Sequence, residues 1–183
     1  MPAATPGQRM RSLGIVQGDD PRLRQATRPF DLPADADEAR RIIVGLNAVL
    51  DQVAAAHRFV TGTGLAAPKI GIDRAAIAVR TPDRALALLN PRIVEESTRT
   101  DELYEGCLSF FDVRGMVPRP LTIQVEHQDP GGGYYVATFG RRLARLVAHE
   151  IDHLRGTLYT DRMRPGAAPI PVCQYRAPGT THR

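Results

Sequence analysis

The chain has 183 residues, of which 43% are hydrophobic and 24% are charged, as in an ordinary globular domain. No run of about eighteen apolar residues is present and the start lacks an apolar signal core, so neither a membrane-spanning helix nor a secretory signal is expected. The net charge of +4 is scattered along the chain, which argues against a nucleic-acid-binding surface. Two cysteines are too few for a disulfide framework, and we therefore expect a cytoplasmic protein.

Composition divides the chain into three parts. Residues 1–12 are expected to form a flexible N-terminus, and residues 13–165 a single domain that contains every motif described below. Residues 166–183 are rich in proline and glycine and are expected to form an irregular tail, which contains Cys173. No internal repeat or long linker interrupts the central domain.

Hydrophobic periodicity predicts the elements in chain order. Residues 31–59 predict a long amphipathic helix with acidic residues at its start. "TGTGLAAPKIGI" at 61–72 predicts a shaped loop that leads into a strand. Short strands are predicted at 75–80, 85–94, 121–127 and 134–139, and a second helix at 141–156. The predicted fold class is α+β, with mostly antiparallel sheets packed around the C-terminal helix.

The last predicted helix contains "HEIDH", residues 149–153. His149 and His153 are four residues apart and therefore lie on one face of a helix, where they can bind one metal ion together. Glu150 is rotated by about 100° from His149, so it lies near the metal without being a natural ligand. In sites of the H-E-x-x-H type this carboxylate is the general base for water. Several unrelated hydrolase families share the pattern.

A catalytic metal site commonly has three protein ligands and an open position. Cys107, within "EGCLS" at 105–109, is the best candidate for the third ligand. The alternative interpretation of a lone cysteine is a small, buried hydrophobic residue.

Three segments in this order resemble the motifs of the peptide deformylases: "GTGLAAPKIG" at 62–71, "EGCLS" at 105–109 and "HEIDHLRG" at 149–156. The similarity extends over about residues 13–165. It implies a hydrolase that removes the formyl group from N-formylmethionyl peptides in protein biosynthesis and releases formate. It also implies one divalent cation, typically Fe²⁺ with Zn²⁺, Ni²⁺ or Co²⁺ as substitutes, bound by Cys107, His149 and His153.

The resemblance also implies roles for other residues. Glu150 would be the general base, and the backbone N–H of Leu108 and the side chain at position 69 would donate to the developing oxyanion. The substrate would lie against four further residues, namely Gly62, Gly64, Leu65 and Gly106.

Three residues depart from the family pattern. Position 69, usually glutamine, is Lys69, the only lysine of the chain. Lys69 could replace the glutamine as donor, recognise an acidic group on an unusual substrate, or be a bystander. Ala148 stands where the family usually has glutamine, and Phe111 where it usually has proline, so the rim of the cleft could differ in shape.

The departures leave three hypotheses about function. The first is a peptide deformylase, and the second is a related amidase that acts on an N-formylated or N-acylated small molecule. The third is a metal-binding relative with little catalytic activity. In each case the partner is an N-formylated substrate or its analogue, without nucleic acid or membrane. The tail lacks the basic helix that some relatives use to dock on ribosomes, so ribosome docking is not expected.

Overall fold

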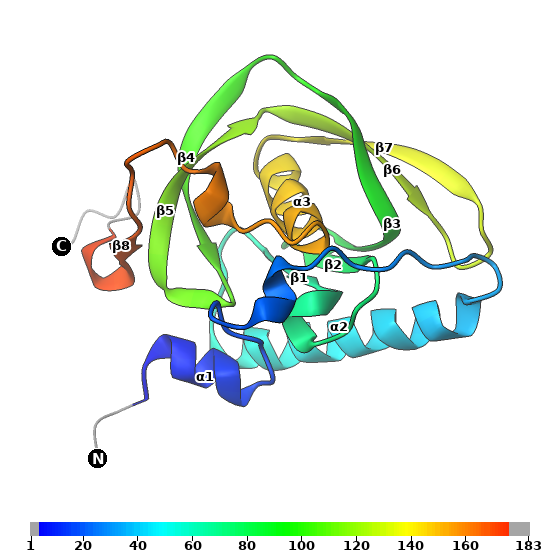
Figure 1. Ribbon diagram of the computed structural model, residues 1–183, viewed down its shortest axis with the longest axis horizontal. Coiled ribbons are helices and arrows are strands. Elements are labelled where there is room, and N and C mark those ends of the chain that lie inside the picture. The colour runs from blue at the N-terminus through cyan, green and yellow to red at the C-terminus, as the bar shows by residue number, and fades with distance from the viewer. Residues whose placement is uncertain (1–3, 176–183) are drawn as a thin grey trace.

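The computed structural model describes residues 4–175 (Figure 1). Its α-helices are α1 (Pro6–Ser12), α2 (Ala36–Ala56) and α3 (Arg141–Leu154). Figure 1 shows α3 in the middle of the molecule, with α2 lying across one side. Within the described residues, no helix is both long enough and apolar enough to cross a bilayer.

Two antiparallel sheets surround α3. The larger sheet has the strand order β1-β2-β3-β6-β7, and the smaller one has the order β4-β5-β8. The strands are β1 (Thr63–Ala66), β2 (Ala76–Arg80), β3 (Ala85–Glu96), β4 (Thr100–Cys107), β5 (Phe110–Pro120), β6 (Thr122–Gln128), β7 (Tyr134–Gly140) and β8 (Ile170–Pro171). The predicted α+β class, with antiparallel sheets around the C-terminal helix, is confirmed.

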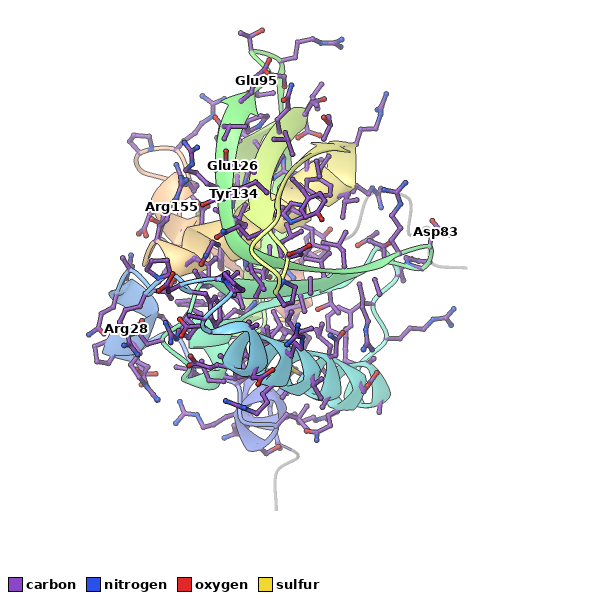
Figure 2. The ribbon with its side chains drawn as sticks, turned by 90° about the vertical axis from the view of Figure 1, so that its right-hand side faces the viewer. Arg28, Asp83, Glu95, Glu126, Tyr134 and Arg155 are labelled. Atoms are coloured by element: carbon purple, nitrogen blue, oxygen red, sulfur yellow. The ribbon has the colours of Figure 1, made fainter. Side chains whose placement is uncertain are left out.

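Strand β2 of the larger sheet is apolar on both faces because a helix covers each one. Along β2, Ala76 and Ala78 pack in the hydrophobic cluster of α2, whereas Ile77 and Val79 pack in the cluster of α3. This alternation follows from the period of two residues in a strand. Charged side chains such as Arg28, Asp83 and Glu95 point outward in the side view of Figure 2.

The loop predicted before β2 is in part a strand. Residues Thr63–Ala66 form β1, which pairs antiparallel with β2, and Ala67–Ile70 form a 3₁₀ turn. Glycine and proline predict a loop here, but the backbone of these residues pairs with a strand that arrives later in the sequence. Such a tertiary contact outweighs local propensity.

The segments on either side of the predicted central domain contain regular structure within the described residues. Within the segment expected to be flexible, Pro6–Ser12 form α1, whose N-cap Thr5 accepts a hydrogen bond from the backbone N–H of Gln8. Met10 is only 1% exposed and packs in the core cluster of α2. In the tail, β8 pairs with β5, which corrects the expectation of an irregular segment from residue 166 onward. Residues 176–183 of the predicted tail lie outside the described part.

The packing of α1 generates a stability prediction. Met10→Ala leaves a cavity in the core, so we expect the free energy of unfolding to fall by about 2–5 kcal/mol. Arg9→Ala, at an exposed position of the same helix, is the matched control and should leave stability nearly unchanged. Chemical denaturation measures both. Equal stabilities of the two variants would show that α1 does not pack on the domain.

Candidate metal centre

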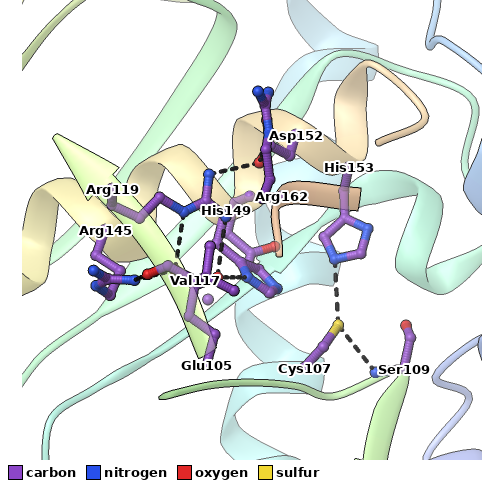
Figure 3. Close-up of polar contacts among 12 residues, drawn as sticks. Glu105, Cys107, Ser109, Val117, Arg119, Arg145, His149, Asp152, His153 and Arg162 are labelled. Carbon is purple, nitrogen blue, oxygen red and sulfur yellow. Dashed lines mark hydrogen bonds and ion pairs between the residues drawn. The ribbon is translucent and has the colours of Figure 1, made fainter. Parts of the chain in front are cut away.

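Three potential ligands from two distant segments meet in the interior. Cys107 lies at the end of β4, and His149 and His153 lie four residues apart on α3. One ligand atom from each lies within 4.8 Å of the others, and all three side chains are buried. Cys107 Sγ is 3.3 Å from His153 Nε2 (Figure 3). The structure thus brings together the three residues that the sequence predicted as ligands.

The donor chemistry of this cluster fits a transition-metal ion. One thiolate and two imidazoles suit cations such as Fe²⁺, Zn²⁺, Ni²⁺ and Co²⁺. Nε2 of His149 is buried and has no hydrogen-bond partner among the described residues. A buried polar atom without a partner is costly, and a cation bound to it would remove that cost. Cys107, His149 and His153 are therefore able to bind such an ion.

Nearby charges shift the pKa values of the potential ligands. Burial alone would favour the neutral thiol of Cys107, but the positive charge of Lys69 and contacts with the neighbouring imidazoles lower its pKa well below the usual value. Burial likewise disfavours charge on His149, but the Cys107 thiolate and the Glu105 carboxylate raise its pKa to about 10. Binding of a cation to this imidazole therefore displaces a proton.

Glu105 orients His149. Nδ1 of His149 donates to Glu105 Oε2 at 3.0 Å, which leaves Nε2 for the metal side (Figure 3). Despite its burial, hydrogen bonds from His149 and Arg119 hold the pKa of Glu105 well below the usual range, so this carboxylate is ionised. A carboxylate behind a ligating histidine fixes the tautomer and the ring orientation.

Arginines complete this buried network. Arg119 donates to both oxygens of Glu105, at 2.9 and 3.0 Å, and to Asp152 at 2.6 Å. Arg145 donates to Glu105 at 2.7 Å and to Asp101 at 2.6 Å. These contacts connect β4 and β5 to α3, and thereby fix the distance between Cys107 and the histidine helix.

Lys69 and Glu150 form a second buried ion pair, beside the ligands. Lys69 Nζ lies 3.2 Å from each oxygen of Glu150 and 3.3 Å from the carbonyl oxygen of Gly64. Burial opposes the ammonium, but the negative charges of Cys107 and Glu150 raise the pKa of Lys69 above its usual value. Lys69 is therefore a cation, and these three contacts occupy its three N–H donors.

Comparisons with known proteins agree with this geometry. The family model described as polypeptide deformylase matches residues 12–168. A peptide deformylase from Shouchella clausii is 32% identical over 174 residues, which span 86% of this chain and 94% of that protein. Another, from Halalkalibacterium halodurans, is 35% identical over 161 residues, which span 81% of this chain and 88% of that protein.

The chain belongs to the polypeptide deformylase family. Solved structures of the family share its fold. The peptide deformylase of Thermotoga maritima matches with a TM-score of 0.73 and 30% identity, over 82% of this chain and 97% of that one. The class I type b enzyme of Acinetobacter baumannii, in a structure bound to Met-Ala-Ser, matches with a TM-score of 0.72 and 28% identity, over 81% of this chain and 96% of that one.

A cleft of about 550 Å³ adjoins the ligand cluster of this family member. Gly62, Gly64, Gly106 and Leu108 line it, as do Lys69, His149 and Glu150. Leu65 does not line it: this side chain is fully buried in the core, because successive residues of β1 point to opposite faces. The expected contact between Leu65 and the substrate stays a prediction, and it would have to involve the backbone of β1.

The structure shows a second reason for a glycine at position 64, which the sequence did not indicate. A Cβ at this position would lie 2.7 Å from Cγ and from Oε1 of Glu150. The absence of a side chain thus makes room for the carboxylate as well as for the cleft.

The two other departures from the family pattern have different surroundings. Ala148 packs in the apolar cluster of α3. Phe111 is 5% exposed, lies at the wall of the cleft and contacts the rings of His57 and Phe59 edge to face.

Sequence reasoning gave Glu105 and Arg145 no role of their own, although spacing contained a signal for both. Glu105 is two residues before Cys107 in a strand, so the two side chains share a face. Arg145 is four residues before His149 and shares its face of α3. This spacing predicts that the side chains lie close to the metal ligands, but it does not predict the hydrogen bonds between them.

The buried network generates a prediction on stability and metal affinity. Glu105→Gln leaves Arg119 and Arg145 without their shared charge partner, so we expect the free energy of unfolding to fall by about 3–5 kcal/mol. Metal affinity should fall by about 10–100-fold, because His149 loses the carboxylate that orients it. Chemical denaturation and metal titration measure the two effects.

Glu102→Gln is the matched control. Glu102 lies on the same strand and pairs at 3.0 Å with Arg164, whose side chain is 69% exposed. Water screens this pair, so the control should lose far less stability and keep its metal affinity. Equal losses in both variants would contradict a special role for the buried carboxylate.

Proposed function

We propose that this family member hydrolyses the formyl amide of N-formylated peptides, with one divalent cation bound by Cys107, His149 and His153. The products are formate and a peptide with a free amino terminus. The observation that carries the proposal is the buried cysteine–histidine–histidine cluster at a cleft that also contains the Lys69–Glu150 pair. A bound divalent cation supplies a Lewis acid that polarises the amide carbonyl and makes bound water more acidic.

Glu150 transfers the protons. Its carboxylate accepts a proton as the oxygen of water forms a bond to the formyl carbon. The C–N bond then breaks, and Glu150 returns the proton to the leaving amine nitrogen. Its burial, with a side chain only 2% exposed, limits competition from bulk water.

Lys69 positions Glu150. Its ammonium contacts both carboxylate oxygens, and it has no free N–H for the substrate while all three contacts persist. Once Glu150 has accepted a proton, its attraction for the ammonium falls, and one N–H becomes available to the oxyanion. The backbone N–H of Leu108, next to the ligand Cys107, is the second proposed donor.

The cleft favours a peptide over a compact small molecule. It lies between β1, an edge strand of the larger sheet, and β4, an edge strand of the smaller one. Edge strands present unpaired backbone groups, which an extended peptide can use by adding as a strand. The related Acinetobacter baumannii enzyme has been solved with the peptide Met-Ala-Ser bound, which supports the same substrate class here.

Formate release tests the proposed activity. A chelator should abolish formate release from formyl-Met-Ala-Ser, and a divalent cation should restore it. Glu150→Gln should lower kcat by about 10²–10⁴-fold, because it removes the group that transfers protons. Glu96→Gln, at an exposed position of β3, is the control and should retain the activity. Metal content, measured in parallel, should be similar in both variants.

Failure of the proposed function has a clear signature. If metal-loaded wild-type protein releases formate no faster than Glu150→Gln, the chain is not a deformylase under these conditions. If a formylated amino acid is turned over faster than the tripeptide, the small-molecule amidase becomes the better description.

The role of Lys69 can be separated into charge and hydrogen bonding. Lys69→Met removes both and leaves Glu150 buried without a partner, so we expect kcat to fall by about 10²–10³-fold. Lys69→Gln keeps an N–H donor without the charge and should lie between Lys69→Met and wild type. Denaturation curves should accompany the kinetics, because loss of a buried ion-pair partner also destabilises the fold. Wild-type turnover in Lys69→Gln would show that the ammonium is not needed.

A further inference from the structure

The cleft contains more positive charge than its own carboxylates neutralise. Three carboxylates line it, and each already has a cationic partner: Glu102 pairs with Arg164, Glu105 with Arg119 and Arg145, and Glu150 with Lys69. Four cationic side chains line the same cleft, namely Lys69, Arg114, Arg142 and Arg145. Two of them, Arg114 and Arg142, form no ion pair with any residue in the described range 4–175.

Arg142 is the more accessible of the two unpaired arginines. It lies in the first turn of α3 and is exposed at the cleft. Within residues 4–175, no hydrogen-bond acceptor or carboxylate engages its guanidinium. All five N–H donors of this guanidinium are therefore free of contacts with the described protein.

Arg114 adds charge to the cleft from β5. Its Nη1 donates to the carbonyl oxygens of Phe111 and Val113, at 3.0 and 2.8 Å, and its guanidinium lies over the Phe111 ring. These contacts fix the side chain but do not neutralise it. Arg114 is half-buried on β5, so water screens its charge less than it would screen an exposed arginine.

The position of Arg142 indicates which part of a substrate would reach it. Arg142 precedes His149 by seven residues on α3, which is nearly two turns, so both face the cleft. The rise of about 1.5 Å per residue separates them by about 10 Å along the helix axis. An extended peptide covers about 3.3–3.6 Å per residue, so this distance corresponds to about three residues or to one residue with a long side chain.

We propose that the cleft selects formylated substrates that carry a carboxylate close to the formyl group, and that Arg142 binds this carboxylate. Arg114 contributes positive charge from β5, and the apolar wall formed by Leu103, Met116 and Leu146 contacts the rest of the substrate. A guanidinium binds a carboxylate through two parallel hydrogen bonds, which are stronger than neutral ones. This inference rests on the proposed deformylase activity and names its substrate class.

Matched substrates isolate the charge. Formyl-Glu-Ala-Ser amide and formyl-Gln-Ala-Ser amide differ in one negative charge at nearly equal shape, and they test a side-chain carboxylate. Formyl-Met-Ala-Ser and formyl-Met-Ala-Ser amide test, in the same way, a main-chain carboxylate three residues from the formyl group. We expect metal-loaded wild-type protein to have the higher kcat/KM for the acidic member of at least one pair.

Three variants test whether Arg142 causes the preference for the acidic substrate. Arg142→Leu should lower the acid-to-amide ratio of kcat/KM by about tenfold, which corresponds to one charge-assisted hydrogen-bonding contact. Arg142→Lys keeps the charge and should retain most of the ratio. Arg41→Leu removes an exposed arginine of α2 and is the control, with ratio and activity both unchanged. Because Arg142 is exposed, the wild-type preference should also decrease as salt is added.

The outcomes separate this inference from the proposed function. Formate release with no preference for either acidic substrate in wild type, or an equal ratio in wild type and Arg142→Leu, would overturn the inference and leave the deformylase intact. If no formyl peptide is hydrolysed, equilibrium binding of Glu-Ala-Ser amide and Gln-Ala-Ser amide still decides it. Tighter binding of the acidic peptide by wild type, but not by Arg142→Leu, would support the anionic subsite without turnover. Equal binding would overturn it.

Discussion

The ionised carboxylate of Glu105, buried between β4 and α3, is the interaction on which the rest of the structure depends. It accepts hydrogen bonds from Arg119, Arg145 and His149, so one side chain connects strands β4 and β5 of the smaller sheet to α3. An isolated buried charge would be strongly destabilising, and a pair of charges often only breaks even. Each buried charge of the network therefore needs its partners if the fold is to remain stable. Its completeness makes the distance between Cys107 and His149 a fixed property of the fold.

Two buried charge systems meet at this site with different tasks. The one centred on Glu105 contacts Nδ1 of His149 and positions that ligand. The pair of Lys69 and Glu150 borders the cleft, so its members can respond when a proton moves. The first system has three cationic donors around one carboxylate, whereas in the second a single ammonium contacts one carboxylate and one carbonyl oxygen. Both systems consist of ionic contacts. The network around Glu105 is rigid because it has many partners, whereas the Lys69–Glu150 pair has few and can adjust when a proton moves.

The sequence predicted those parts of the fold that depend on local pattern. The helix α3, its paired histidines and the alternation along β6 follow from periods of 3.6 and 2 residues. The strands β4 and β5 have no such pattern, because residues such as Glu105 and Arg119 are buried as ion pairs instead of as apolar side chains. Met10 was missed for a related reason: a helix of seven residues has little stability of its own and forms here because it packs on a distant strand. Tertiary partners cannot be read from a short segment, and this limit applies equally to the unpaired Arg142.

Lys69 is the only lysine of the chain, and all its other Lys or Arg positions are arginine. The geometry around position 69 explains this choice. The acceptors Glu105 and Asp152 lie on two different elements, β4 and α3, and the planar, five-donor guanidinium of Arg119 spans them. At position 69 the acceptors are two oxygens of one carboxylate and one carbonyl, all within 3.3 Å of a single atom. An ammonium is a compact charge with three donors, and it matches this small enclosure. An arginine there would bury two further N–H groups, each of which would need its own acceptor. The choice of cation thus agrees with the number of acceptors that each group contacts.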